Sequence, residues 1–481
     1  MKKFQVILFI LITAFSLMAE DFFINGSNEL KYIYKARKDS LNTFFEDEFG
    51  FNFSYGKFSY GMKFIARLPK YDFFDNKEFL KASDLYTVWD ERYVSFESDN
   101  FYILGGIYQE SFGTGIVLSS IYDKDFDIDT RITGSQIRIN SNGWSIKGIY
   151  GTIKDDEKKN STDVVFGADL EKTIKSFIFG GSALVYRKIH NLDNKFSKYN
   201  IYSAKANYSS DIFEANIEFD KIKEDSLNNE LSDLKDGIAL YATTNIYLKK
   251  ITLTAGYKKY QDFDIYINDP PRLNYSDEPL SENIKAGKDE EGFMGEIRFE
   301  PNYENNLIVN YSEAWNKEKT IKLSDAYLKA EHDFDDKALT LEFSRTERYE
   351  EPISEWTKEI IPVVSYDTKF NNIALHLKAQ YKIKEKVHFE EETIEYEPYF
   401  QSDFSYKDKS LSLILVYPHK DFDNLLKNKL WLGLEGKASI FENLDVTLFV
   451  GKEKGGKVCR NGVCKYQSQF SGVKLNLNTS F

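Results

Sequence analysis

Hydrophobic and polar residues alternate one by one along many segments of about ten residues each. The clearest case is 213–220, where four apolar residues alternate with four polar ones: Phe213, Glu214, Ala215, Asn216, Ile217, Glu218, Phe219 and Asp220. A helix cannot place such a pattern on one face, whereas a strand sends successive side chains to opposite sides. The pattern recurs in 251–258, 338–344, 373–384, 430–440, 444–453 and 473–481. We therefore predict tilted β-strands long enough to cross a bilayer.

The connections between these segments alternate between tight and long. Tight joins fall near 55–56, 98–100, 140–143, 209–211, 249–250, 335–337, 371–372, 407–409 and 442–443. Long joins fall at 67–89, 110–130, 155–161, 189–198, 224–235, 264–291, 351–357, 385–390 and 420–429. Outer-membrane barrels have short periplasmic turns and long extracellular loops. We predict an all-β fold: one large antiparallel transmembrane β-barrel of about 24 strands, within about two, and both termini in the periplasm.

The first nineteen residues have the features of a secretory signal peptide. Lys2 and Lys3 precede an apolar core over 6–17, and Ala19 is a small residue before Glu20. This core is shorter than the roughly 20 residues of a membrane-spanning helix. We therefore expect a signal peptide over 1–19, one barrel domain over 20–481, and location in the cell outer membrane.

Composition supports a membrane barrel. Aromatic residues make up 16% of the chain, with 39 Phe and 32 Tyr, and Pro is scarce with 9 residues. Aromatic girdles at both membrane interfaces require such a composition. Without residues 1–19, which hold two lysines and no acids, 61 basic and 76 acidic residues give a net charge of -15. The expected partners are outer-membrane lipid, lipopolysaccharide and the barrel-assembly machinery, and nucleic acid is excluded.

A barrel of this size has a lumen that wall side chains cannot fill. About 24 strands tilted by about 40° give a diameter near 48 Å. Segment 110–130 is the candidate for a loop that folds inward, because a flexible Phe112–Gly113–Thr114–Gly115 stretch precedes apolar residues at 116–118. An external loop packed on its neighbours is the alternative.

Ten residues are candidates for lining or narrowing the lumen. Four lie in segment 110–130 and six lie on the polar faces of predicted strands: Glu110, Phe112, Gly113, Gly115, Glu214, Glu218, Asp220, His376, Lys378 and Lys382. His376 with its neighbouring lysines would line a path for anions, and an ordinary charged barrel wall is the alternative interpretation.

The only two cysteines flank a hairpin signal. Asn461–Gly462 favours a two-residue type I′ turn, which places Cys459 opposite Cys464. Their Cα atoms would then lie about 4.5 Å apart, within the range that a disulfide tolerates. Because exported proteins meet an oxidising compartment, we predict a disulfide here. A metal site is the weaker alternative, since two thiolates need further ligands and the five histidines are scattered.

Two other features suggest specific roles. The last strand ends in Phe481 and resembles the aromatic-ended assembly signal of outer-membrane barrels. Four alternating carboxylates, Asp123, Asp125, Asp127 and Asp129, could hold calcium, but they lack the glycine and closing glutamate of a calcium loop, which favours a solvated acidic loop. No catalytic arrangement can be assembled, so we expect no enzyme, cofactor or metal site.

Two stretches carry a resemblance to a known family. They are Gly105 to Leu118, with Phe112–Gly113–Thr114–Gly115 at its centre, and Gly455 to Cys464 followed by Phe470–Ser471–Gly472–Val473. Both resemble an uncharacterised family of outer-membrane β-barrels, a domain of unknown function found in Gram-negative bacteria. The resemblance implies a barrel and assigns no substrate or catalytic residue.

Two functions from different classes fit these predictions. The first is a porin-like channel that admits small polar solutes, because the predicted inward faces are charged. The second is a structural or docking barrel that binds other envelope proteins through its long loops 67–89 and 264–291. A membrane-embedded enzyme is a third and weaker alternative.

Overall fold

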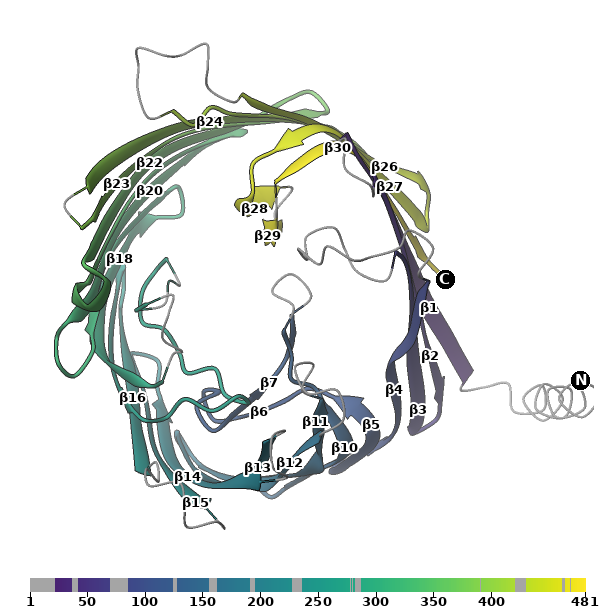
Figure 1. Ribbon diagram of the computed structural model, residues 1–481, viewed down its shortest axis with the longest axis vertical. Coiled ribbons are helices and arrows are strands. Elements are labelled where there is room, and N and C mark those ends of the chain that lie inside the picture. The colour runs from purple at the N-terminus through teal and green to yellow at the C-terminus, as the bar shows by residue number, and fades with distance from the viewer. Residues whose placement is uncertain are drawn as a thin grey trace, which may run out of the picture.

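The chain forms one closed antiparallel β-barrel, seen end-on in Figure 1. This computed structural model describes residues 22–36, 42–69, 85–123, 128–154, 162–190, 195–226, 236–276, 278, 280–281, 287–389, 391–419, 430–460, 463–467 and 469–481. The main sheet has 24 strands, which confirms the predicted fold class and strand number.

The first half of the barrel wall consists of β1 (Phe22–Lys35), β2 (Thr43–Tyr55), β3 (Phe58–Leu68), β4 (Tyr86–Ser98), β5 (Phe101–Tyr108), β10 (Ile132–Ser141), β11 (Trp144–Lys154), β12 (Thr162–Ile174), β13 (Phe177–His190), β14 (Lys195–Ser209), β15 (Phe213–Ser226) and β16 (Asp236–Leu248). The second half consists of β17 (Ile251–Gln261), β18 (Asp289–Asn302), β19 (Asn305–Trp315), β20 (Ile321–Phe334), β21 (Lys337–Glu350), β22 (Glu355–Phe370), β23 (Ile373–His388), β24 (Glu391–Tyr406), β25 (Lys409–Val416), β26 (Trp431–Phe441), β27 (Leu444–Glu453) and β30 (Phe470–Ser480). Three short hairpins, β6–β7 (Glu110–Phe112, Leu118–Ser120), β8–β9 (Tyr122–Asp123, Ile128–Asp129) and β28–β29 (Gly456–Arg460, Val463–Gln467), and the 3₁₀ turn η1 (Glu351–Ile353) lie in the connections.

The first and last strands close the barrel by pairing with each other. β1 pairs with β30 in antiparallel register. Beyond the paired region, the backbone N–H of Gly26 donates to the Phe481 carbonyl oxygen at 2.9 Å, and the Phe481 N–H donates to the Gly26 carbonyl at 3.0 Å. Closure therefore satisfies the backbone of both edge strands, as a strand in lipid requires.

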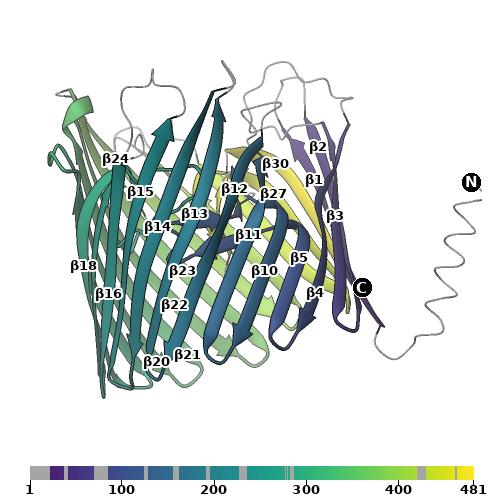
Figure 2. The ribbon, with the colours of Figure 1, turned by 90° about the horizontal axis from the view of Figure 1, so that it is seen from below.

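Strand connections differ between the two ends of the barrel, as Figure 2 shows. Every tight join predicted from the sequence is a short turn between consecutive strands. The predicted long join at 385–390 is wrong, because β23 runs to His388 and β24 begins at Glu391. His388 still pairs with Glu355 on β22, so the charged end of β23 remains in the sheet. Predicted loops 189–198 and 224–235 are shortened in the same way, since β13 reaches His190, β14 begins at Lys195 and β15 reaches Ser226.

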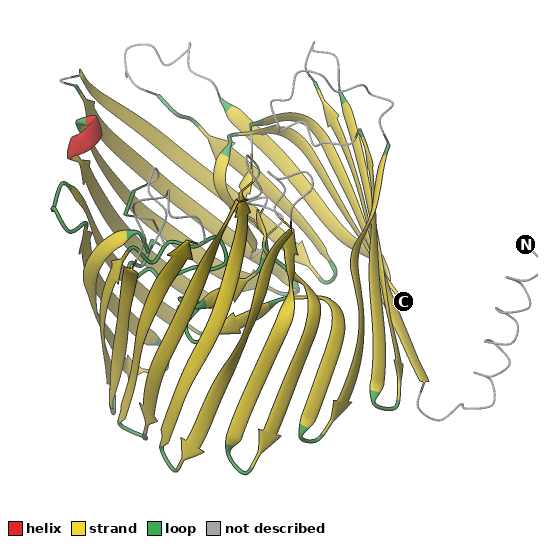
Figure 3. Ribbon diagram, turned by 60° about the horizontal axis from the view of Figure 1, so that its bottom comes forward, coloured by secondary structure: helices red, strands yellow, loops and turns green. Residues whose placement is uncertain are grey.

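Side chains alternate between the outer and inner faces of the wall. On β15, Phe213, Ile217 and Phe219 are exposed, whereas Glu218 and Asp220 are almost fully buried. Large apolar side chains outside and polar ones inside fit a barrel whose outer face meets lipid. Figure 3 shows that loop segments lie within the ring of strands.

The predicted signal peptide at 1–19 lies outside the described residues. Over the part of the chain that the structure describes, no helix is long and apolar enough to span a membrane.

Candidate functional site: the inner face of the barrel

A short hairpin follows β5 and lies inside the ring (Figure 1). We call residues 110–120, which contain β6 and β7, the inner hairpin. Four of its apolar side chains are completely buried: Phe112, Ile116, Val117 and Leu118. They pack with inward-facing residues of β5 and of strands from β10 to β17. The sequence left open whether 110–130 folds inward or outward, and the structure places this part of it against the inner wall.

Glu110 fastens the base of the inner hairpin to the wall. Its carboxylate forms ion pairs with Arg138 on β10 at 2.9 Å and with Lys147 on β11 at 3.2 Å. The side-chain amide of Gln136 on β10 also donates a hydrogen bond to it. Glu110 is 6% exposed, so removal of its charge would leave two cations without their buried partner.

The tip of the inner hairpin contacts β15. The backbone N–H of Thr114 donates to Oε2 of Glu218 at 2.8 Å. Gly113 has a φ of +59°, and a Cβ atom there would lie 1.9 Å from Oε1 of Glu218. Gly115 also has a positive φ, +94°. Both glycines are therefore required by backbone conformation, and Gly113 also by the close approach of the carboxylate.

A second chain segment extends this inner layer. We call the described residues 262–276, 278 and 280–281 the inner segment. Its backbone is joined to the inner hairpin by hydrogen bonds from the Ser119 N–H to the Ile267 carbonyl at 2.8 Å and from the Asp269 N–H to the Gly115 carbonyl at 3.1 Å. The apolar residues Phe263 and Ile267 are fully buried.

The inner segment then follows the wall toward β21. The Ser276 N–H donates to Asp325 on β20 at 2.7 Å, and Glu278 pairs with Arg348 on β21 at 2.8 Å. The hydroxyl of Ser281 donates to Glu350 at 2.9 Å. The prediction that 264–291 is a long extracellular loop is therefore wrong for the inner segment, because its polar groups find partners on inward-facing side chains.

The wall beneath this layer is apolar on its inner face. Ile149, Val165, Leu184, Tyr186 and Ile201 point inward and are nearly or fully buried. The sequence predicts polar residues on the inward faces, so these apolar inward positions were not predicted. Their signal was present: strands β11 to β14 carry apolar residues on both faces near their loop ends.

Buried charges lie beside the tip of the inner hairpin. Lys205 on β14 pairs with Asp169 at 3.0 Å and with Glu171 at 2.6 Å, both on β12. Asp220, two residues beyond Glu218 on β15, is 0% exposed, and neither of its carboxylate oxygens has a hydrogen-bond partner among the described residues. Burial without a partner is costly for an ionised carboxylate.

The wall around β22–β24 has a different inner face, with partly exposed charged side chains. Lys382 and Lys384 on β23 both pair with Glu359 on β22, at 2.5 and 2.9 Å. Lys378 lies opposite Ser365 and Gln401, and no ion pair joins it to another described residue. Its charge is therefore available to the lumen.

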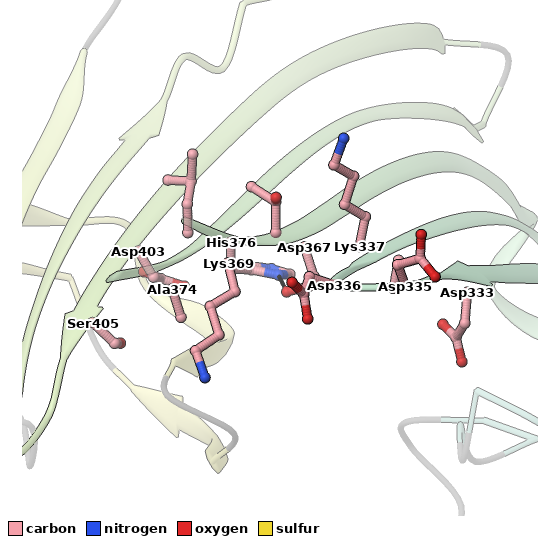
Figure 4. A pocket seen from close by; sticks show the side chains of 13 residues that line it. Asp333, Asp335, Asp336, Lys337, Asp367, Lys369, Ala374, His376, Asp403 and Ser405 are labelled. Carbon is pink, nitrogen blue, oxygen red and sulfur yellow. Dashed lines mark hydrogen bonds and ion pairs between the residues drawn. The ribbon is translucent and has the colours of Figure 1, made fainter. Parts of the chain in front are cut away.

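His376 lies in a cavity of about 400 Å³ at the turn end of β20–β24, drawn in Figure 4. Its Nδ1 is 2.7 Å from Asp367 on β22, and it lies opposite Asp403 on β24. Further carboxylates from the turn after β20, among them Asp335 and Asp336, line the same cavity.

The ten candidate residues thus fall into three groups. Glu110, Phe112, Gly113, Gly115 and Glu218 come together, with Asp220 beside them. Glu214 lies nearer the turn end, where Asn245 and Tyr247 donate to its carboxylate at 3.2 and 2.7 Å. The β23 residues form a separate group.

The other candidate features lie largely beyond what the structure describes. The register places Cys459 opposite Cys464, but the turn and the side chains of both strands are outside the described residues, so the disulfide stays a prediction. Asp125 and Asp127 are likewise outside, and Asp129 accepts hydrogen bonds from Arg131 at 2.7 and 2.9 Å. Among the described side chains, no group of three or more His, Cys, Asp or Glu residues is arranged to hold a metal ion.

Solved structures of outer-membrane proteins share this architecture. A chain of the E. coli P pilus tip assembly intermediate PapC-PapD-PapK-PapG matches with a TM-score of 0.57 at 8% identity, over 96% of this chain and 60% of that one. The protein thus spans about 60% of the length of that chain. The P pilus usher (PapC) translocation pore and the siderophore receptor PirA from Pseudomonas aeruginosa each match with a TM-score of 0.48, at 8% and 10% identity. Those matches cover 95% of this chain in both cases, and 99% and 80% of the other chain, respectively. The fold is that of a large outer-membrane β-barrel.

Within this class, the chain belongs to a family of unknown function (DUF6029), whose model matches residues 1–327. The match includes the 105–118 stretch that carries the inner hairpin and ends before the 455–473 stretch. No curated protein matches the sequence.

Proposed function

We propose that the protein is an outer-membrane channel for small polar solutes, with a lumen narrowed by the inner hairpin and the inner segment. The observation that carries the proposal is that the inner wall has two regions with different surfaces. From β10 to β21 the wall is covered by a fastened layer of chain. Around β22–β24 the wall keeps partly exposed charged side chains, including Lys378, as expected for a path lined for polar solutes.

The inner layer explains how so large a barrel can have a narrow lumen. A wall of 24 strands encloses far more space than wall side chains can fill. An inner layer held by Glu110 and Glu218 reduces this space. The remaining charged wall would then select among solutes by charge.

The docking alternative is weakened by one observation. Of the two long loops assigned to partner binding, 264–291 contributes residues 264–276, 278 and 280–281 to the inner face, where Glu278 and Ser281 contact wall residues. Those residues are engaged inside the barrel rather than presented to a partner.

Ion conductance across planar bilayers tests the proposal. The wild-type barrel is expected to conduct in small steps. A variant in which 110–120 is replaced by a short Gly-Ser linker is expected to conduct in clearly larger steps. A matched control replaces Glu351–Ile353, the η1 turn with no buried residue, with Gly and Ser residues and is expected to conduct like the wild type. If the purified, folded barrel carries no current even without the inner hairpin, the channel proposal is rejected.

A further inference from the structure

Two carboxyl groups lie side by side on the inner face of β15, at the tip of the inner hairpin. Glu218 and Asp220 are two residues apart on one strand, so their side chains point to the same face. They are 2% and 0% exposed, and they lie within hydrogen-bonding range of each other. Ionised carboxylates accept hydrogen bonds and cannot donate them. The contact is therefore favourable only if a proton or another positive charge lies between the two groups.

None of the described cations is free to neutralise Asp220. The two buried lysines of the neighbouring strands already have carboxylate partners: Lys205 on β14 pairs with Asp169 and Glu171, and Lys258 on β17 pairs with Glu290. Ser203 lies opposite Asp220 in the β14–β15 register, but its hydroxyl is directed at Oε1 of Glu218, at 3.4 Å. A proton is then the simplest charge that can stabilise the pair, and it needs no further ligands.

The surroundings differ between the two carboxyl groups and indicate which of them holds the proton. Glu218 accepts the Thr114 backbone N–H at 2.8 Å and the Ser203 hydroxyl at 3.4 Å, and such donors favour an ionised carboxylate. Asp220 is completely buried, and no described donor reaches either of its oxygens, which makes its ionised form costly. The proton therefore belongs to Asp220, which can donate it to Glu218.

The other titratable groups around the pair come from the wall and from the inner segment. On the wall, Tyr241 on β16 lies opposite Glu218, and Tyr260 on β17 follows it, beside the paired lysines named above. Residues 111–119 of the inner hairpin contain no titratable side chain. The inner segment contributes side chains that are all at least partly exposed: Asp262, Asp264, Tyr266, Asp269, Arg272 and Tyr275. Its one cation, Arg272, lies 3.9 Å from Asp269.

We propose that Glu218 and Asp220 share one proton, and that this proton makes the attachment of the inner hairpin sensitive to pH. Asp220 donates the proton in a hydrogen bond to Oε1 of Glu218, while Oε2 of Glu218 accepts the Thr114 N–H. At alkaline pH the proton passes to water, and two negative charges then face each other in a buried site. Their repulsion moves Glu218 away from Thr114 and releases the hairpin tip.

The direction of the effect follows from proton linkage. The attached form holds one proton more than the released form, in which water reaches Asp220 and the carboxyl ionises readily. Attachment therefore weakens as the pH rises, and the ratio of attached to released hairpin falls by up to about tenfold per pH unit. This inference concerns the attachment alone and stands whether or not the barrel conducts ions.

Hydrogen–deuterium exchange of the whole folded barrel in detergent measures the release. Backbone exchange within 112–118 is compared between wild type and variants at each pH, so that the intrinsic effect of pH on exchange cancels. Asp220→Asn keeps the shape of the side chain and a donor for Glu218 but cannot ionise. Glu296→Gln is the matched control, because it replaces a carboxylate on the inner face of β18 that accepts a hydrogen bond from Asn310 at 3.0 Å.

At neutral pH the wild type and both variants are expected to protect 112–118 equally. At alkaline pH the wild type and Glu296→Gln are expected to lose this protection, by up to about tenfold per pH unit, whereas Asp220→Asn keeps it. Infrared spectroscopy gives a second readout, since a protonated carboxyl group has its own C=O band. The band is expected at neutral pH in the wild type and in Glu296→Gln, and it is expected to be absent from Asp220→Asn and from Asp220→Ala, so that one folded variant suffices.

Three results would each overturn the proposal. The first is a parallel loss of protection in the wild type and Asp220→Asn as the pH rises. The second is a wild-type barrel without the protonated carboxyl band at neutral pH, or a band that both Asp220 variants retain. The third is a metal ion that copurifies with the wild type and is lost from Asp220→Asn, because a cation rather than a proton would then neutralise the pair.

Discussion

Glu218 and Thr114 are 104 residues apart in the chain, yet the Glu218 carboxylate accepts a hydrogen bond from the Thr114 backbone N–H at 2.8 Å. One residue belongs to the barrel wall and the other to the tip of the inner hairpin. This contact, together with the Glu110 ion pairs at the base, holds the inner hairpin at both ends. The predictions about the lumen follow from this double attachment.

Glu110→Gln should loosen the base of the inner hairpin. The substitution preserves shape but removes the charge that faces Arg138 and Lys147. Because these cations are 42% and 27% exposed, water replaces part of the lost interaction, and the cost is about 1–2 kcal/mol. Limited proteolysis within 110–131 of the folded barrel measures the loosening. Arg345→Gln is the control, because its pair with Glu347 is 49% and 31% exposed and such pairs contribute less than about 1 kcal/mol. Equal protection of Glu110→Gln and wild type would contradict the role of Glu110.

Gly113→Ala should displace the hairpin tip. A Cβ atom at Gly113 would collide with the Glu218 carboxylate, and its φ of +59° costs a residue with a Cβ atom about 1 kcal/mol more. Gly105→Ala on β5 is the control, because its nearest neighbour would be Val94 at 4.0 Å. Single-channel conductance should rise for Gly113→Ala and stay unchanged for Gly105→Ala. A higher conductance for Gly105→Ala than for Gly113→Ala would show that the tip does not narrow the lumen.

Asp220→Asn and Asp169→Asn should affect stability in opposite ways. Asp220 is buried without a hydrogen-bond partner, so a neutral amide of the same shape should maintain or increase stability. Asp169 accepts hydrogen bonds from Lys205 and from Ser182, and its neutralisation should cost about 3 kcal/mol. The stability of the two variants is compared by heating each in detergent and recording the temperature at which the fast-migrating band of the folded barrel disappears from the gel. A larger loss of stability for Asp220→Asn would refute this account of the buried charges.

Lys378→Gln should lower the permeability of the channel to anions relative to cations. Lys378 forms no ion pair with a described residue, whereas Lys382 is neutralised by Glu359 at 2.5 Å. The reversal potential in a salt gradient should therefore shift more for Lys378→Gln than for the control Lys358→Gln. Lys358 lies opposite Glu385 and pairs with it at 3.1 Å, on the outward face of β22. An unchanged reversal potential would exclude the β23 wall from the permeation path.

The wall of the barrel could be predicted from sequence because each strand carries its own signal. Segment 444–453 coincides with β27, and 373–384 lies within β23. Strand ends were harder to predict, since pairing continues beyond the lipid belt, where charged residues such as Glu385 and Lys386 occupy both faces. The charges of that run predict a loop, although Glu385 and Lys386 pair with Lys358 and Thr357.

The inner layer could be predicted only in part. The apolar residues at 116–118 indicated burial for the inner hairpin, but its contact with Glu218 joins distant parts of the chain and leaves no local pattern. The inner segment had a weak signal, since Phe263, Ile265 and Ile267 continue the alternation of β17. Whether such a strand-like stretch turns inward depends on partners such as Ser119 and Asp325, which only the folded barrel brings near.

A designed disulfide between the inner hairpin and the wall tests the central claim most directly. In a background with Cys459 and Cys464 replaced by serine, Gly113→Cys is combined with Glu218→Cys, because a Cβ atom at 113 faces the Glu218 side chain and the shorter cysteine at 218 makes room for it. Gly113→Cys with His376→Cys, on the β23 wall, is the control pair. We predict that the first pair forms a bridge in the folded barrel, detected by a shift on a non-reducing gel, and that the control pair does not. A folded barrel in which both thiols of the first pair stay free and react with a water-soluble reagent would contradict an inner hairpin fastened to the wall.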